Sequence, residues 1–186
     1  MRKIFTAPQG VEVAGSAAKA MIQNLASREI DAFAEKHGLA NISLHDWVPL
    51  QSLCDLFNEF YDSAPANAEQ AFVAMGMRVA EQSEFPPEMI AELTLPVMLM
   101  GWDDHYKANH RGGDLPPVRT KQISDTEYEL HMLGEAHPYP YNMTYGMIFS
   151  FGKMLLPTGT HCNVSYDEKR SPYGTWENGV VIKVSW

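Results

Sequence analysis

The sequence lacks several patterns that identify a compartment or a membrane protein. It has two cysteines, Cys54 and Cys162, and no C-x-x-C or C-x-x-C-H pattern, so structural zinc and covalently attached haem have no support. Its longest strongly apolar stretch, residues 93–100, is much shorter than the roughly 20 residues that cross a bilayer core. The basic start is not followed by the apolar segment of a signal peptide. We expect a cytoplasmic protein with reduced thiols and no membrane partner.

The chain also has few basic residues. It carries 14 Lys and Arg against 23 Asp and Glu, a formal net charge of −9. A chain this acidic is repelled by phosphate backbones, so we expect no nucleic-acid partner. No G-x-G-x-x-G or phosphate-loop pattern occurs, and the pair Gly112 and Gly113 is too short to cradle a pyrophosphate. No G-x-S-x-G nucleophile elbow is present either.

The amino-acid composition and the spacing of apolar residues change near residue 115. Ala, Leu, Met and Glu at helical spacing dominate before it, whereas Val, Ile, Thr, Tyr and Gly in short alternating segments dominate after it. A chain of 186 residues, 45% hydrophobic, can form one domain with a sizeable core. We therefore predict an α+β fold in a single ligand-binding-like domain, residues 1–186, with a helical half over 1–113 and a sheet half over 114–186.

The spacing of apolar residues predicts four helices in the first half. The first runs over residues 11–37 and ends before Gly38, and the second begins at the capping-box-like segment 43–46 and ends at Pro65. The third contains Phe72, Met75, Gly76 and Val79. The fourth starts after residue 87, is kinked at Pro96 and ends at residues 112–113.

The second half predicts an antiparallel sheet with an inserted helix. A hairpin of strands at 118–123 and 128–133 is joined by a short turn around Asp125. A helix comes next, over about 142–155, and the chain closes with strands at 160–166 and 180–186. The apolar surface of four amphipathic helices is larger than one face of a small sheet can cover. We therefore also predict a homodimer through the N-terminal helices, which would bury the remaining apolar surface.

The best cluster of metal-ligand residue types is Asp103, Asp104, His105 and His110. The two histidines are five residues apart, about 140° around a helix, whereas helical ligands that face one point are three or four apart. Cationic side chains such as His and Lys near the C-terminal end of a helix are also stabilised by the helix dipole. We interpret this cluster as a polar helix terminus and expect no metal site.

Aromatic residues and methionines are dense around the predicted inserted helix. Such residues can line an apolar ligand cavity, with hydroxyl groups that orient the ligand, or can form ordinary core. The kink at Pro96 leaves room beside the fourth helix, so a cavity is expected between that helix, the helix 142–155 and the hairpin. The candidate ligand-binding residues are Tyr145, Phe149, Tyr139, Tyr141, His105, Trp102 and Met98.

Four short segments carry a family resemblance. They are residues 139–142 (Tyr-Pro-Tyr-Asn), 145–148 (Tyr-Gly-Met-Ile), 164–168 (Val-Ser-Tyr-Asp-Glu) and the closing strand 180–186. With the order of elements, they resemble the superfamily of 4-vinyl reductase (hydrocarbon-binding) domains, haem nitric-oxide-binding domains and small subunits of the Golgi transport particle. The resemblance implies a small-molecule-binding or sensor-like domain.

The cofactor residues of these relatives are missing. The cysteine positions of the vinyl-reductase type fall near Ser171 and Asn178, and the Tyr-x-Ser-x-Arg set that holds haem propionates does not occur. On this resemblance we expect no haem, no metal and no other cofactor. The leading hypothesis is a domain that binds a small apolar or aromatic ligand. The alternatives are a small-molecule hydrolase or other enzyme on the same scaffold, and a structural interaction subunit.

Overall fold

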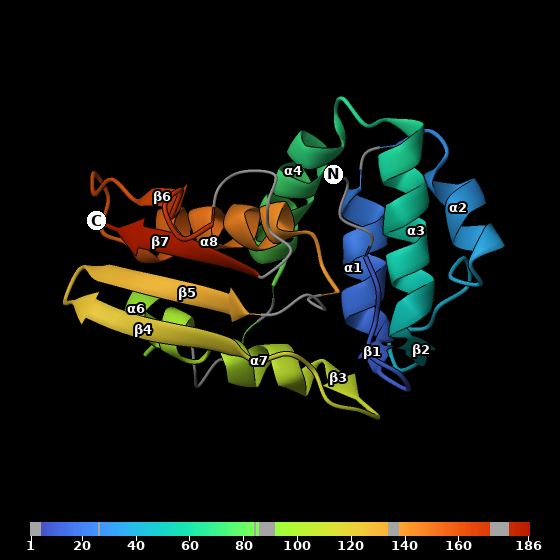
Figure 1. The fold of residues 1–186 in the computed structure, drawn as a ribbon, viewed down its shortest axis with the longest axis horizontal. Coiled ribbons are helices and arrows are strands. Elements are labelled where there is room, and N and C mark those ends of the chain that lie inside the picture. Colours follow the sequence, from blue (N-terminus) through green and yellow to red (C-terminus); the bar gives the residue numbers. More distant parts are fainter. Residues whose placement is uncertain (1–4, 26, 84, 86–91, 134–137, 172–178) are drawn as a thin grey trace.

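The computed structural model describes residues 5–25, 27–83, 85, 92–133, 138–171 and 179–186. Figure 1 shows helices α1, α2 and α3 at one end and a four-stranded sheet at the other, with α8 alongside the sheet and α4 between α8 and the helical end. The elements of the first half are β1 (Glu12–Ala14), α1 (Gly15–Asn24), α2 (Ile30–Lys36), β2 (Trp47–Pro49), α3 (Leu50–Ser63) and α4 (Ala68–Glu81). The remaining elements are α6 (Leu95–Met100), α7 (Trp102–Ala108), β3 (His110–Arg111), β4 (Val118–Ser124), β5 (Glu127–Leu133), α8 (Tyr141–Leu155), β6 (Asn163–Tyr166) and β7 (Gly179–Ser185).

The helix expected over 11–37 is wrong, because this segment forms β1, α1 and α2. Val13 of β1 is fully buried and pairs with Val48 of β2 and His110 of β3, which makes a small antiparallel sheet in the order β2-β1-β3. Between α1 and α2 the Ser27 hydroxyl accepts a hydrogen bond from the Glu29 amide. Such local bonds compete with helical ones and interrupt the helix. Gly38 does end α2 as expected, with φ at 72°.

The second helix begins at Leu50, seven residues later than the capping-box pattern predicts. The Asp46 carboxylate accepts a hydrogen bond from the Ser43 amide (2.7 Å), and the Ser43 hydroxyl accepts one from the His45 amide (3.3 Å). These bonds close a turn instead of capping a helix. The turn leads into β2, and α3 comes directly after it.

The fourth predicted helix is divided differently from the expectation. Pro96 lies in the first turn of α6, where a missing amide is harmless, and the Thr94 hydroxyl accepts a bond from the Val97 amide at the same end. The break falls at Gly101, which separates α6 from α7. The expected start after residue 87 lies outside the described residues. The break places Trp102 and His105 on a short helix of their own.

Helices α4 and α8 cross in very close contact. A Cβ added at Gly76 would overlap the carbonyl oxygen of Met143, and one added at Gly146 would overlap that of Val73. Glycine at both positions therefore lets the two backbones touch. The predicted third helix and the predicted inserted helix are both confirmed, by α4 and α8 respectively.

The large sheet has the order β4-β5-β7-β6 and is antiparallel throughout. The predicted hairpin is confirmed, with Val118 opposite Met132 and a register shift between Gln122 and Ser124. Strand β7 pairs with β5 and β6, which places the C-terminal strand inside the sheet. The α+β class, with helices before an antiparallel sheet and an inserted helix, is confirmed, although a second small sheet accompanies the expected one.

Two hydrophobic clusters fill the interior. The first is built from α1, α2, α3 and α4 and contains edge-to-face contacts among Phe5, Phe57 and Phe72. The second lies under the large sheet. The exposed large hydrophobic side chains of the described residues are Leu44, Val97, Met100, Ile123 and Met154. None of these five belongs to α1, α2, α3 or α4, so the apolar faces of those helices are covered within the chain.

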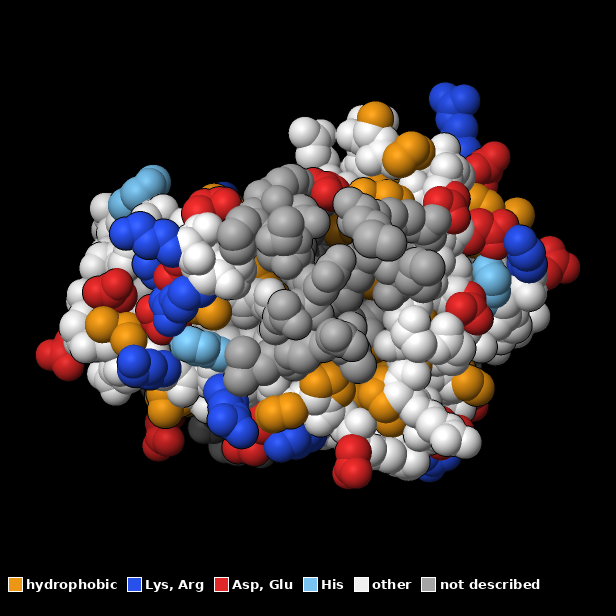
Figure 2. Space-filling model, in the orientation of Figure 1, with side chains coloured by type: hydrophobic (Ala, Val, Ile, Leu, Met, Phe, Trp, Pro, Cys, Tyr) orange, Lys and Arg blue, Asp and Glu red, His pale blue; other side chains and the backbone are white. Residues whose placement is uncertain are grey.

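The surface carries charges of both signs. Figure 2 shows Lys and Arg side chains gathered at the sheet end of this face, with acidic side chains among them. In the sheet half of the chain, Arg170 donates hydrogen bonds to both Glu129 and Asp167. Among the described residues, no helix is both long and apolar enough to span a membrane.

Candidate ligand-binding cavity

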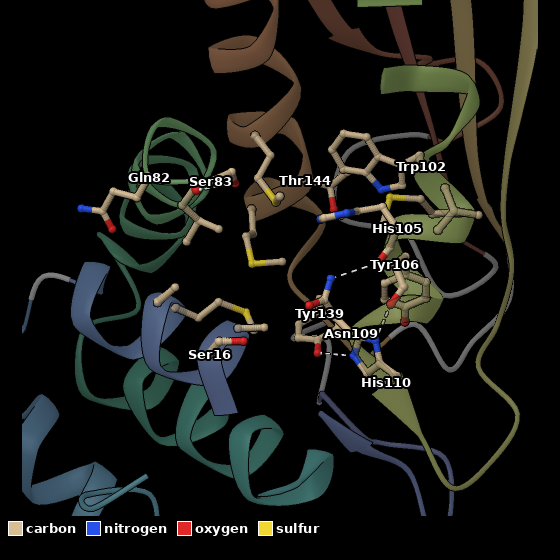
Figure 3. A pocket seen from close by; sticks show the side chains of 18 of the residues that line it. Ser16, Gln82, Ser83, Trp102, His105, Tyr106, Asn109, His110, Tyr139 and Thr144 are labelled. Atoms are coloured by element: carbon tan, nitrogen blue, oxygen red, sulfur yellow. Dashed lines mark hydrogen bonds between the residues drawn. The ribbon is translucent and has the colours of Figure 1, made fainter. Parts of the chain in front are cut away.

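A cavity of about 490 Å³ lies where the two hydrophobic clusters meet. Its walls come from α1, α4, α7 and α8, and the hairpin contributes one residue from each strand. Figure 3 shows these elements around the open space. The described lining residues are Ser16, Ala17, Ala20, Met21, Leu44, Val79, Gln82, Ser83, Trp102, His105, Tyr106, Asn109, His110, Val118, Met132, Tyr139, Met143, Thr144 and Met147.

Among the described lining residues, His105 has the imidazole that is best placed to bind a ligand. Its side chain projects from α7 into the open space (Figure 3). Neither imidazole nitrogen has a hydrogen-bond partner among the described residues, and the residue is exposed. Burial by the cavity walls lowers the pKa of the imidazole. His105 therefore presents a neutral ring with a free nitrogen lone pair.

His110, by contrast, is fixed at both ring nitrogens. Its Nδ1 lies 2.6 Å from the Tyr106 carbonyl oxygen, and its Nε2 lies 2.6 Å from the Tyr139 hydroxyl. A carbonyl oxygen only accepts, so Nδ1 carries the proton and Nε2 accepts the hydrogen bond from Tyr139. Burial lowers the pKa of His110 and outweighs the opposing effect of the Tyr106 carbonyl. The pair forms a rigid polar corner of the cavity.

The other polar groups on the walls are neutral. Ser16, Gln82, Ser83, Asn109 and Thr144 supply hydroxyl and amide groups, and the described lining includes no Lys, Arg, Asp, Glu or Cys. The described residues also contain no group of three or more His, Cys, Asp or Glu that could hold a metal ion. The cavity thus suits a bulky, largely apolar group with one strong nitrogen donor against it.

The structure brings three of the seven expected ligand-binding residues to the cavity. Trp102, His105 and Tyr139 line it. Tyr145 lies elsewhere, with its hydroxyl donating to the Val164 carbonyl oxygen at 3.0 Å and its ring against Tyr166.

The other three belong to the second hydrophobic cluster, namely Phe149, Tyr141 and Met98. Whether any of the seven touches a ligand stays a prediction. The geometry favours Trp102, His105 and Tyr139.

Sequence reasoning missed the wall formed by α1. Ser16, Ala17, Ala20 and Met21 line the cavity from this helix. The signal is the run of small residues at helical spacing in 16–20, which leaves space beside a helix. The same stretch also fits a long amphipathic helix whose apolar face packs into a filled core. The small residues alone therefore do not show that a cavity lies beside this helix.

No protein-family description and no curated protein matches the chain. Solved structures do match. A single-residue mutant of the T. tengcongensis H-NOX has a TM-score of 0.66, covering 92% of this chain and 96% of that chain at 16% identity. A structure described as probing heme distortion in the H-NOX family has a TM-score of 0.66, with 93% and 94% covered at 16% identity. An oxygen-binding H-NOX domain related to soluble guanylate cyclases, in its oxygen complex, has a TM-score of 0.62, with 92% and 91% covered at 14% identity.

At these identities the likeness shows the fold. The haem nitric-oxide-binding branch of the expected resemblance is therefore confirmed at the level of the fold, whereas the vinyl-reductase and transport-particle branches are not shown.

The same matches correct the expected partners. The expectation of a small apolar or aromatic ligand is wrong, because the matching structures are described with heme and with oxygen, which is a cofactor-type ligand. The expected homodimer through the N-terminal helices is wrong as well. Its premise was uncovered apolar surface, and these helices pack into one core within the chain.

Proposed function

We propose that the chain is a small-molecule sensor domain that binds an iron tetrapyrrole of the haem class in the cavity, with His105 as the protein ligand to iron. The observation that carries the proposal is the free imidazole of His105, which faces a hollow of about 490 Å³. A bound haem would supply a redox-active iron that can bind a small gas molecule.

The donor chemistry fits an iron tetrapyrrole. A histidine must be neutral to ligate a metal, and burial lowers the pKa of His105, which keeps its ring neutral near pH 7. The competing imidazole of His110 has both nitrogens engaged. His105 is therefore the histidine of the described lining that can accept iron without breaking an existing bond.

The walls fit as well. Ligand cavities are typically about 300–1,000 Å³ and are mostly apolar, with a few placed polar groups. Here Trp102, Val118 and the lining methionines supply apolar surface that excludes water from a large flat ring. A haem also carries two carboxylates, and the described lining offers them hydroxyl and amide donors such as Ser16, Ser83 and Thr144, with no cation.

This proposal replaces the expectation of no haem. That expectation came from the missing Tyr-x-Ser-x-Arg set, which concerns the carboxylates of haem. The missing residues would have bound the carboxylates of the haem, whereas His105 would bind the iron. We infer that affinity rests on the iron bond and the apolar walls.

Reconstitution with hemin tests the proposal. The purified chain is expected to give a Soret band with a stoichiometry of about one haem per chain. His105→Ala is expected to lose this stoichiometric binding, whereas His161→Ala, which removes an exposed histidine outside the lining residues, is expected to retain it. In His105→Gly, added imidazole should restore the spectrum, because the small ligand occupies the vacated position. Equal haem binding in the wild type and His105→Ala would reject the assignment.

A further inference from the structure

Sulfur donors are concentrated in the cavity. Met21 from α1, Met132 from β5, and Met143 and Met147 from α8 all line it. Figure 3 shows yellow sulfur atoms in the same space into which His105 projects. Methionine usually fills gaps in a core, but a thioether is also a soft metal ligand, and histidine with methionine is an established pair of iron ligands.

The two methionines on α8 are held on a rigid base. Met143 and Met147 are four residues apart, so their side chains leave the same face of the helix. Helix α8 is fixed against α4 where Gly76 touches the backbone of Met143, and where Gly146 touches that of Val73. This close approach sets the distance between the two helix backbones, whereas an unbranched methionine side chain can adjust its reach.

Other donors in the described lining are occupied or weak. Both nitrogens of His110 are engaged, and the Tyr139 hydroxyl donates to one of them. The Tyr106 ring packs against the rings of His110 and Tyr139. Neither cysteine lines the cavity. After His105, the thioethers are the strongest iron donors left.

We propose that a haem in this cavity would be held by His105 of α7 and by a thioether of α8, Met143 or Met147, so that the protein would supply one nitrogen and one sulfur ligand to the iron. This inference rests on the proposed haem binding. It would give the site a specific property, because a gas would compete with a protein sulfur for the iron.

The test begins with the spectrum of the reconstituted wild type. A histidine–methionine ligand pair predicts a low-spin ferric haem with the long-wavelength sulfur-to-iron charge-transfer band. The double variant Met143→Leu/Met147→Leu keeps similar side-chain volume and is expected to bind haem, to lose this band and to become high-spin. One of the two single variants should reproduce the loss and thereby identify the ligand.

Two control variants separate ligation from packing. Met21→Leu removes a thioether from the α1 wall, and Met75→Leu removes a fully buried methionine that does not line the cavity. Both are expected to keep the low-spin spectrum. Carbon monoxide should bind the ferrous double variant more tightly than the wild type, by about tenfold for a wild type whose iron is open in about a tenth of the molecules.

The outcomes distinguish the two proposals. If the wild type binds no stoichiometric haem, the proposed function fails, and this inference fails with it. If the wild type binds haem through His105 but is high-spin without the charge-transfer band, only the methionine ligand is rejected. Retention of the low-spin spectrum in the double variant also rejects it, as does loss of that spectrum in Met21→Leu.

Discussion

The Tyr139 hydroxyl donates a hydrogen bond to Nε2 of His110 at 2.6 Å, where the segment before α8 meets β3 at the end of α7. Tyr139 is 3% exposed, and the opposite nitrogen of His110 is held by the Tyr106 carbonyl. This relationship fixes the tautomer of His110 and removes it from competition for a ligand. It also ties the segment before α8 to the end of α7.

Tyr139→Phe is expected to destabilise the fold. It leaves the Nε2 acceptor of His110 without its donor, and an unpaired buried polar group costs about 1–3 kcal/mol. Tyr145→Phe provides a matched comparison, because its hydroxyl donates to the Val164 carbonyl away from the cavity. We expect it to cost about 1 kcal/mol and to leave haem binding unchanged. Denaturant unfolding measures both changes, and equal stability of Tyr139→Phe and the wild type would contradict the first.

The free energy of unfolding is expected to decrease as the pH falls below about 6.5, the ordinary histidine pKa. Burial lowers the pKa of His105 and of His110 in the folded chain, so the unfolded chain takes up protons first in this range. Stability is therefore greater above this window and is lost as the pH falls through it. Denaturant unfolding at about pH 7.5 and 5.5 measures the change.

His105→Ala should reduce the pH dependence of unfolding without abolishing it, because His110 remains. The matched variant His161→Ala removes an exposed histidine outside the cavity lining and controls for the loss of one histidine. A steeper slope in His105→Ala would show that the sign is wrong.

Arg170→Ala is expected to cost about 1–2 kcal/mol, a value reduced because the arginine side chain is 43% exposed. It removes the partner of the Glu129 carboxylate, which is 9% exposed, and of Asp167. Hydrogen bonding from Arg170, more than from His131, lowers the pKa of Glu129 to about 2. Arg119→Ala, which removes an exposed arginine on β4, should change stability by less than about 0.5 kcal/mol.

The pH dependence identifies the role of Arg170. In the wild type the contribution of Glu129 is present above its unfolded pKa and is lost as the pH falls toward 2. In Arg170→Ala the carboxyl titrates closer to its ordinary range, so the loss of stability between about pH 5 and 2 becomes smaller. An unchanged acid profile would show that the ion pairs do not set the pKa of Glu129.

Gly76→Ala is expected to destabilise the chain by about 2–3 kcal/mol, or to prevent folding, because the new Cβ overlaps the Met143 carbonyl. Helix propensity alone would make Gly76→Ala more stable by about 1 kcal/mol. The sign of the change in unfolding free energy therefore distinguishes helix propensity from steric overlap. Ala74→Gly, at an exposed position of the same helix, should cost about 1 kcal/mol through propensity only. Increased thermal stability of Gly76→Ala would contradict the close crossing.

The sequence predicts well where local pattern and tertiary contact agree. The hairpin, α4, α8 and the closing strand are predictable from periodicity and turn residues that no distant contact overrides. The small sheet is not, because its strands are two or three residues long and exist through pairing between distant segments, such as Val13 with His110. Its residues also fit a helical spacing, and a spacing cannot show where a helix is interrupted.

The candidate site is only partly predictable. Trp102 is identifiable because the sequence places it on a helix face near an expected break, although the break lies at Gly101 and not at Pro96. His105 follows from it as a polar side chain on the same helix. Tyr145 and Phe149 share a face on α8, but a shared face does not reveal whether core or cavity lies opposite. Tyr145 contacts the Val164 carbonyl, whereas Met143 and Met147 of the same helix line the hollow.

The hollow between the two hydrophobic clusters makes the stability of this chain depend on the composition of the solution. Met147 and Tyr106 pack against both clusters and also line the cavity, so a molecule bound there would contact both parts of the core. A ligand that binds only the folded chain adds about 2.7 kcal/mol at one hundred times its dissociation constant. The melting temperature therefore rises with the concentration of a ligand that binds in the cavity. Thermal unfolding in the presence of candidate compounds can identify such ligands.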